Sequence, residues 1–209
     1  MTRLVLTSIA ILCMASAVTR GQGAAAPSTL GAQAPVLVDA QLKGLYLSIK
    51  RSLTQLADKM PADQFNFQPT PDVRTFAAAV AHTASTNFGV CANLTGQPNP
   101  MKDVELEKTA TTKAEVTKAL ADSFTFCDGY AATLSPTTID GTYEATWVGR
   151  DGQRRPVTAQ RAGLFAALIA HGNEMYGYMS VYLRLKGLVP PASEPSGPGR
   201  GRGGAGGRG

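Results

Sequence analysis

The sequence contains two histidines, His82 and His171. Each lies near the middle of a long stretch with helical periodicity. An imidazole nitrogen is a good ligand for zinc, nickel, iron and copper ions, so two histidines on facing helices would supply part of a divalent metal site. A single histidine within a helix is also often an ordinary core or surface side chain. The spacing alone leaves both roles open.

The residues that would surround His82 on a helix are all small. Residues three, four and seven positions away share one helical face. For His82 they are Thr75, Ala78, Ala79, Ser85, Thr86 and Gly89. Such a face leaves space around the imidazole, as a binding pocket requires. The corresponding residues around His171 are Leu164, Ala167, Leu168, Glu174, Met175 and Tyr178. This second face combines an apolar wall with two further possible ligands, Glu174 and Met175.

Four long segments would have to position these side chains. Their apolar residues recur at steps of three and four, which predicts amphipathic helices. The expected helices cover residues 38–60, 73–94, 112–134 and 158–187. Asp72 or Thr70 is a candidate cap for the second helix, and Thr112 with Glu115 forms a capping-box pattern at the third. Residues 141–158 contain β-branched and aromatic side chains around a Gly-containing turn, which indicates a short hairpin or an ordered loop.

These elements predict an all-α fold, a four-helix bundle with a short hairpin or loop before the last helix. Such bundles build their sites from inward-facing side chains of neighbouring helices. That is the arrangement that two histidine ligands would need. The sequence has no strand followed by a Gly-rich turn and a helix, so a nucleotide-binding βαβ unit is not expected.

Both ends of the chain differ in composition from the middle. Residues 1–23 begin with Arg3, continue with a short apolar run and reach small residues near Ala15, which is the pattern of a secretory signal peptide. Residues 194–209 are rich in Gly and Arg, lack large apolar side chains, and are expected to be disordered. The folded domain is expected over residues 35–193. We expect export to the periplasm or the extracellular space, and no membrane span after the signal is cleaved.

The formal net charge of +5 comes mostly from these two ends, and residues 21–189 carry about +1. A nucleic-acid partner is therefore not expected. After export, Cys91 and Cys127 would lie in an oxidising compartment, where an even number of cysteines permits a disulfide. Cys91 lies half a turn around the helix from His82 and points away from it. Either a disulfide between the second and third helices or two buried thiols would fit.

Two separated segments of the sequence resemble one known family. "KMPADQFNFQPTPDVRTFAAAVAHTASTNFGVCANLTG", residues 59–96, carries a Pro-rich aromatic segment before the first histidine. "HGNEMYGYMSVYLRLKGLVPPAS", residues 171–193, begins with the second. In this order they resemble the DinB-like superfamily, in particular its exported members, over residues 38–193. The resemblance implies a four-helix bundle with a long crossover.

The resemblance also implies a metal site of three histidines, one from the second helix and two, four residues apart, from the last. His82 matches the first and His171 the second, but Met175 stands at the third place. A thioether is a soft, neutral ligand that binds Zn²⁺, Ni²⁺ or Fe²⁺ poorly. Glu174 is the nearest other donor, although its direction differs from that of Met175 by about 100°. We expect a degenerate His-His-Met site, whose divalent metal is bound weakly or has been lost.

The family resemblance implies a metal-dependent hydrolase or a thiol S-transferase-type enzyme, in which a metal would lower the pKa of a thiol. Its partner would be a small-molecule ligand or a thiol. The departure at Met175 keeps a second hypothesis open. In that hypothesis the protein is a non-enzymatic envelope or stress protein whose bundle binds a small apolar ligand or forms a homodimer.

Overall fold

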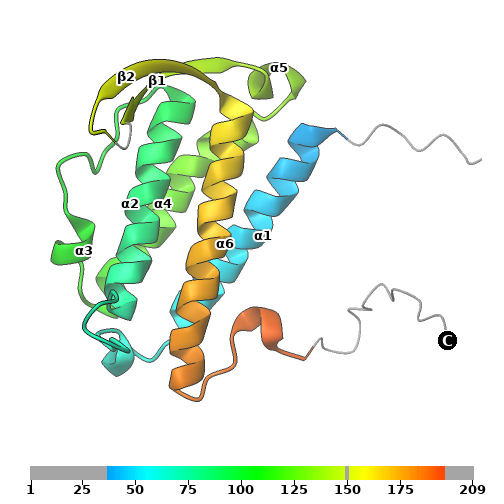
Figure 1. The fold of residues 1–209 in the computed structure, drawn as a ribbon. Coiled ribbons are helices and arrows are strands. Elements are labelled where there is room, and N and C mark those ends of the chain that lie inside the picture. The colour runs from blue at the N-terminus through cyan, green and yellow to red at the C-terminus, as the bar shows by residue number, and fades with distance from the viewer. Residues whose placement is uncertain (1–36, 149–150, 196–209) are drawn as a thin grey trace, which may run out of the picture. The chain divides into compact units, whose positions relative to one another are not determined.

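Four long helices form the frame of the protein, whose computed structural model describes residues 37–148 and 151–195 (Figure 1). They are α1 (Val38–Lys59), α2 (Phe76–Thr95), α4 (Lys113–Ala132) and α6 (Arg161–Leu185). The shorter elements are η1 (Ala62–Gln64), α3 (Leu106–Thr109), α5 (Pro136–Ile139), the strands β1 (Thr142–Val148) and β2 (Arg154–Gln160), and η2 (Pro191–Ser193). The predicted four-helix bundle with a hairpin before its last helix is confirmed. The expected signal peptide and residues 196–209 of the expected tail lie outside the described residues.

Each long helix makes its main contacts with two of the other three, in the circular order α1, α6, α2, α4. Contacts near the helix ends fix the helix directions. The ammonium group of Lys113, at the start of α4, donates hydrogen bonds to the carbonyl oxygens of Asp58 and Met60 at the end of α1, at 2.6 and 2.8 Å. α4 therefore starts at the end of the bundle where α2 also starts. The two helices run parallel.

Because α2 and α4 are parallel, residues 96–112 must return along the bundle, over roughly 30 Å for a helix of this length. This return is the expected long crossover. α3 lies within it and packs against α2, at the left of Figure 1. Side chains of this polar connection therefore lie against α2, the helix that contains His82.

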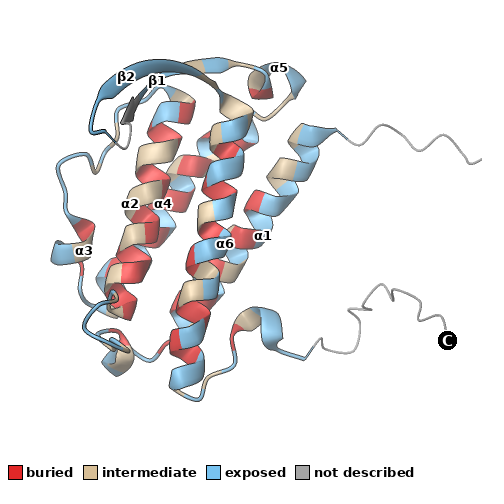
Figure 2. Ribbon diagram, in the orientation of Figure 1, coloured by how far each residue is buried: buried red, intermediate tan, exposed pale blue. Residues whose placement is uncertain are grey.

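The hydrophobic core lies between the four long helices, where Figure 2 shows their inward faces as buried. Each helix contributes a buried aromatic side chain: Tyr46 from α1, Phe76 from α2, Phe124 from α4 and Phe165 from α6. The rings of Tyr46 and Phe165 pack at 5.3 Å between centroids. Such pairs contribute about 0.5–1.5 kcal/mol beyond the burial of their area. The described hairpin side chains are mostly exposed and none belongs to this core, to which the loop residues Met60 and Phe65 also contribute.

A close approach between α1 and α6 depends on Gly172. A Cβ atom at this position would lie 2.9 Å from Cγ1 of Ile49, which is closer than real contacts allow. Glycine therefore lets α6 pack tightly against α1. The residue before it, His171, is only partly buried and reaches the neighbouring helix α2.

A disulfide between Cys91 and Cys127 joins α2 to α4, as one of the two alternatives from the sequence predicts. The Cα atoms are 5.2 Å apart, within the usual range for this bond. Both cysteines are fully buried. The disulfide closes a loop of 36 residues, for which chain entropy predicts a stabilisation of about 4 kcal/mol.

The start of α2 differs from the prediction. Neither Asp72 nor Thr70 caps the helix. Thr75 does so, because its hydroxyl accepts a hydrogen bond from the N–H of Ala78 at 3.1 Å. The Pro-rich segment before it folds back on the helix, and the carbonyl of Phe67 takes up the first helical N–H. The helix therefore begins three residues later than its hydrophobic pattern suggests.

The last helix also starts later than predicted, at residue 161 in place of 158. Residues 158–160 belong to β2 and pair with residues 142–144 of β1 in an antiparallel hairpin. The predicted capping box at α4 is confirmed, with Thr112 and Glu115 bonding to each other's backbone N–H groups. Among the residues that the structure describes, no helix is both long and apolar enough to cross a membrane.

Candidate metal centre between helices α2 and α6

His82 and His171 face each other across the interface between α2 and α6. Their Nε2 atoms are 3.3 Å apart and their ring centroids 5.3 Å apart. The two helices run antiparallel, because the hydroxyl of Tyr182 near the end of α6 donates to the carbonyl of Arg74 just before α2, at 2.7 Å. This direction brings the middle of one helix to the middle of the other. Both imidazoles are only partly buried.

The crossover brings Glu107 to the opposite edge of the His82 ring. Its Oε1 lies 2.7 Å from Nδ1 of His82, and its Oε2 accepts a hydrogen bond of 2.7 Å from Nε of Arg74. The sequence analysis did not identify Glu107 or Arg74 as site residues. Glu107 stands 25 residues after His82, in a segment that reads as a polar loop. One signal could have indicated Glu107. If α2 and α4 are parallel, the segment that connects them has to run back along α2 and pass His82.

The charges around Glu107 keep its carboxylate ionised. Partial burial acts to raise the pKa of Glu107, but hydrogen bonds and charges from Arg74 and His82 outweigh it and hold that pKa below its usual value. A carboxylate beside Nδ1 makes this nitrogen the N–H donor of a neutral imidazole. The lone pair of His82 is then on Nε2, and it points toward His171.

His171 has a different environment from His82. Burial, followed by the nearby charges of His82 and Arg74, lowers the pKa of His171, and Glu174 opposes the shift. The neutral form, which is the one that binds metals, is therefore favoured at neutral pH. Its Nδ1 is buried and has no hydrogen-bond partner in the part of the chain that the structure describes. Only one of the two imidazoles thus has a group that fixes its orientation.

Two tyrosines one turn apart on α6 hold the residue that binds Glu107. The hydroxyl of Tyr178 accepts a hydrogen bond from the backbone N–H of Arg74 at 3.2 Å, and the hydroxyls of Tyr178 and Tyr182 are 2.7 Å apart. Together with the bond from Tyr182 to the carbonyl, they fix the backbone of Arg74 on both sides. The guanidinium of Arg74 is thereby positioned to hold Glu107.

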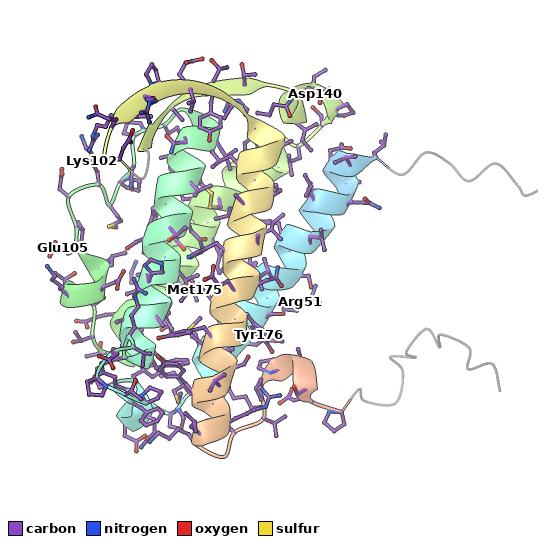
Figure 3. All side chains as sticks on the ribbon, in the orientation of Figure 1. Arg51, Lys102, Glu105, Asp140, Met175 and Tyr176 are labelled. Carbon is purple, nitrogen blue, oxygen red and sulfur yellow. A yellow bond between two sulfur atoms is a disulfide. The ribbon has the colours of Figure 1, made fainter. Side chains whose placement is uncertain are left out.

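Met175 and Glu174 point in different directions. Met175 follows His171 by one helical turn on the same face, and Figure 3 shows it on the stretch of α6 beside α2. Its side chain is buried, with 6% exposed. Glu174 is exposed to solvent. The thioether therefore shares the face of the histidines, and the carboxylate lies about 100° around the helix.

The two imidazoles have the separation of ligands on a single ion. Two ligands of a tetrahedral ion with bonds of roughly 2.0–2.1 Å are about 3.3 Å apart, and the two Nε2 atoms are separated by 3.3 Å. His82 has the carboxylate partner that metal-binding histidines commonly use. No group of three or more His, Cys, Asp or Glu side chains within the described residues could hold a metal ion. The structure therefore brings together two imidazole nitrogens, and Met175 follows one turn after His171 on the same helix.

The family comparison covers the histidine pair and the carboxylate beside it. The DinB superfamily model matches residues 48–177, which include His82, Glu107, His171 and Met175. The chain belongs to the DinB superfamily. No curated protein matches the sequence.

Solved structures of DinB-like proteins have the same fold as this DinB-superfamily chain. One from Bacillus subtilis is 17% identical, with 70% of this chain and 92% of that chain covered and a TM-score of 0.54. Another from Bacillus cereus is 16% identical, with 73% and 95% covered and a TM-score of 0.55. At these identities the likeness shows the fold alone. The chemistry of this DinB site therefore has to be argued from its own side chains.

Proposed function

We propose that this DinB-superfamily protein binds a transition-metal ion through His82 and His171, with the thioether of Met175 as a third, soft donor. The observation that carries the proposal is the Nε2 pair at 3.3 Å, with one ring oriented by Glu107. The lowered pKa of His171 supports it, because a neutral imidazole needs no proton displaced before it binds an ion.

The donor set determines which ion the site prefers. Zn²⁺, Ni²⁺ and Fe²⁺ would find only two strong donors here, and we expect these ions to bind weakly. Cu⁺ accepts thioether sulfur as a ligand, so Met175 adds more to its binding than to theirs. The proposed site thus favours a soft ion, and its remaining coordination position is open to a thiol or water.

The reaction proposed for such a site is a hydrolase or thiol S-transferase reaction. A bound ion would lower the pKa of a coordinated water or thiol. The side chains of this chain would hold the rest of the site: Glu107 keeps the proton of His82 on Nδ1, and Arg74 keeps Glu107 ionised. We propose that the protein works after export, where the Cys91–Cys127 disulfide persists in an oxidising environment.

Metal titrations of untagged protein test the proposal. After dialysis against a chelator, Cu⁺ is titrated in ascorbate against a chromogenic competitor, and Zn²⁺ is titrated separately. We expect one Cu⁺ per chain, with an affinity that falls at least about tenfold in Met175→Leu, while Zn²⁺ affinity changes less than about twofold. His171→Ala should abolish the binding of both ions.

A matched variant separates the two candidate third donors. Glu174→Gln alters the residue next to Met175 on the exposed side of α6 and should leave both affinities unchanged. A loss of Zn²⁺ binding in Glu174→Gln, with none in Met175→Leu, would assign the third donor to the carboxylate. Wild-type protein that binds neither ion would refute the proposed function.

A further inference from the structure

A second hollow lies at the hairpin end of the bundle, away from the histidine pair. It is a cavity of about 780 Å³ between the end of α2, the second half of α4, α5 and the first residue of α6. Its size is within the usual range for small-molecule sites. Leu94 and Arg161, which border it, lie 12 residues after His82 and 10 residues before His171. These offsets place the cavity roughly 15–18 Å along the helices from the imidazoles.

Arg161 is the charged side chain that lines this cavity. Its guanidinium donates a hydrogen bond to the carbonyl of Leu94 in the last turn of α2. Within the described residues, no carboxylate forms an ion pair with it. A guanidinium has five N–H donors, so capping α2 occupies only part of its capacity. Arg161 also borders a neighbouring hollow of about 730 Å³, and it therefore lies between two open spaces.

Tyr130 lines the same cavity and has an unsatisfied hydroxyl. The residue is 4% exposed, and its hydroxyl oxygen has no hydrogen-bond partner in the described part of the chain. Buried polar groups are nearly always hydrogen-bonded, so an exception calls for a missing partner. Burial raises the pKa of Tyr130 and the charge of Arg161 opposes the shift, which places the hydroxyl within the field of the guanidinium. The Tyr130 hydroxyl thus lacks an acceptor within the described residues, and the guanidinium of Arg161 beside it has N–H groups left over after its bond to Leu94.

The positive end of a long helix adds to this field. Arg161 is the first residue of α6, a helix of 25 residues, and the side chain of the capping residue Gln160 makes no hydrogen bond to the helix. A helix N-terminus favours a negative charge. The hydroxyls of Thr125 and Thr133, by contrast, donate to carbonyls of their own helix. They offer no free donor that would attract a second anionic group.

We propose that this cavity binds a small organic acid with an apolar body, whose carboxylate is held by Arg161 and the Tyr130 hydroxyl. A planar carboxylate suits the fork of a guanidinium. The apolar part would lie against Leu94 and Phe126, which line the wall. Arg161 is the one cation among the residues that line the cavity, which matches a single negative charge better than the double charge of a phosphate.

Titrations with matched acids and amides test the site. Phenylacetate and octanoate are compared with phenylacetamide and octanamide, which have nearly the same shape without the charge. Isothermal titration or protein NMR shifts give the affinities. We expect the acids to bind at least tenfold tighter than their amides, since a hydrogen bond to a charged group contributes about that factor. Arg161→Gln should remove the preference for the acid.

Tyr130→Phe separates binding from folding. This variant removes a buried hydroxyl that has no partner, so the melting temperature of the ligand-free protein should stay the same or rise. Its affinity for the acids should fall about tenfold. His171→Ala, which alters the other site, should bind the acids as the wild type does.

Three results would overturn the proposal. The first is equal binding of acid and amide. The second is no binding of either acid at 10 mM, about the weakest affinity that such contacts allow. The third is an unchanged acid affinity in Tyr130→Phe. A purely structural role for Arg161 as the cap of α2 predicts the first of these. Arg161→Lys, which keeps the charge and the cap but loses the planar fork, should weaken acid binding without lowering the melting temperature to the level of Arg161→Gln.

Discussion

The two sides of α2 are held in different ways. Toward α4, Cys91 is covalently joined to Cys127, and the amide of Asn87 donates to the hydroxyl of Ser123 at 3.1 Å in a buried contact. Toward α6, His82 meets His171 through a partly buried contact between two titratable rings. The first interface contains no group that titrates near neutral pH. The second depends on a carboxylate delivered by a four-residue helix.

This difference separates the stability of the bundle from the chemistry of the site. The disulfide on one side of α2 stabilises the bundle. The other side of α2 can therefore hold His82, which Glu107 orients, next to His171, whose Nδ1 has no partner in the described residues. Sites of this kind need rigid support from the elements behind them. We therefore expect changes on the α4 side to alter stability, and changes near α6 to alter binding.

The largest expected effect is on the α4 side. Replacing both cysteines, Cys91→Ala with Cys127→Ala, should lower the free energy of unfolding by about 4 kcal/mol, because the unfolded chain regains the entropy of the open loop. Urea denaturation measures this loss. Metal affinity of the folded variant should change by less than about twofold. A parallel loss of metal affinity would show that the two sides of α2 are not independent.

The next effect concerns the close contact between α1 and α6. Gly172→Ala places a Cβ atom against Ile49 and should cost about 1–3 kcal/mol, because the two helices must separate. Gly177→Ala, on the same helix where the new Cβ meets no neighbouring helix within 4 Å, should instead be neutral or stabilise by up to about 1 kcal/mol. Urea unfolding of the pair measures both. Equal effects at the two positions would contradict the packing account.

A smaller effect is expected from the carboxylate that orients His82. Glu107→Gln keeps the shape of the side chain and loses its charge, and it should weaken metal binding about tenfold. Glu105→Gln is the control, since Glu105 pairs with Lys108 on the surface near the same helix (Figure 3). Competition titrations compare the two variants. If they have the same affinity, Glu107 does not control the imidazole.

The smallest expected effect is a dependence on pH. The pKa of His171 is lowered from the ordinary value of 6.5 by burial, so the folded metal-free protein binds fewer protons than the unfolded chain below that pH. Stability should therefore fall as the pH is lowered through 6.5 toward the folded pKa, and His171→Gln should remove this part of the slope. Proton NMR of the imidazole gives the titration midpoint. A midpoint above 6.5 for His171 would contradict the burial argument.

Most of the fold could be predicted from the sequence because it depends on local patterns. Apolar periodicity marks the four long helices, and the motif around Thr112 and Glu115 marks a helix start that the structure confirms. The starts of α2 and α6 could not be predicted in the same way. Each depends on a neighbouring segment, the folded-back Pro-rich stretch and the hairpin, that competes for the same backbone groups.

The candidate site was less predictable than the fold. The two histidines can be chosen from the sequence because no others exist, and helical spacing sets Met175 on their face. Glu107 and Arg74 could not be chosen, because the contacts of Glu107 with His82 and with Arg74 arise from the path of the crossover. A local pattern contains no information on where a returning loop passes. The electrostatics of the site are therefore a property of the tertiary structure.

The measurement that tests the account most directly is the metal affinity of Met175→His. If Met175 faces the histidine pair, an imidazole at its position completes a set of three nitrogen donors. We predict that the Zn²⁺ affinity of Met175→His exceeds that of the wild type at least tenfold, or about 1.4 kcal/mol, and that its preference for Cu⁺ over Zn²⁺ falls. An unchanged Zn²⁺ affinity would show that residue 175 does not face the site, and it would contradict the His-His-Met centre proposed for this protein.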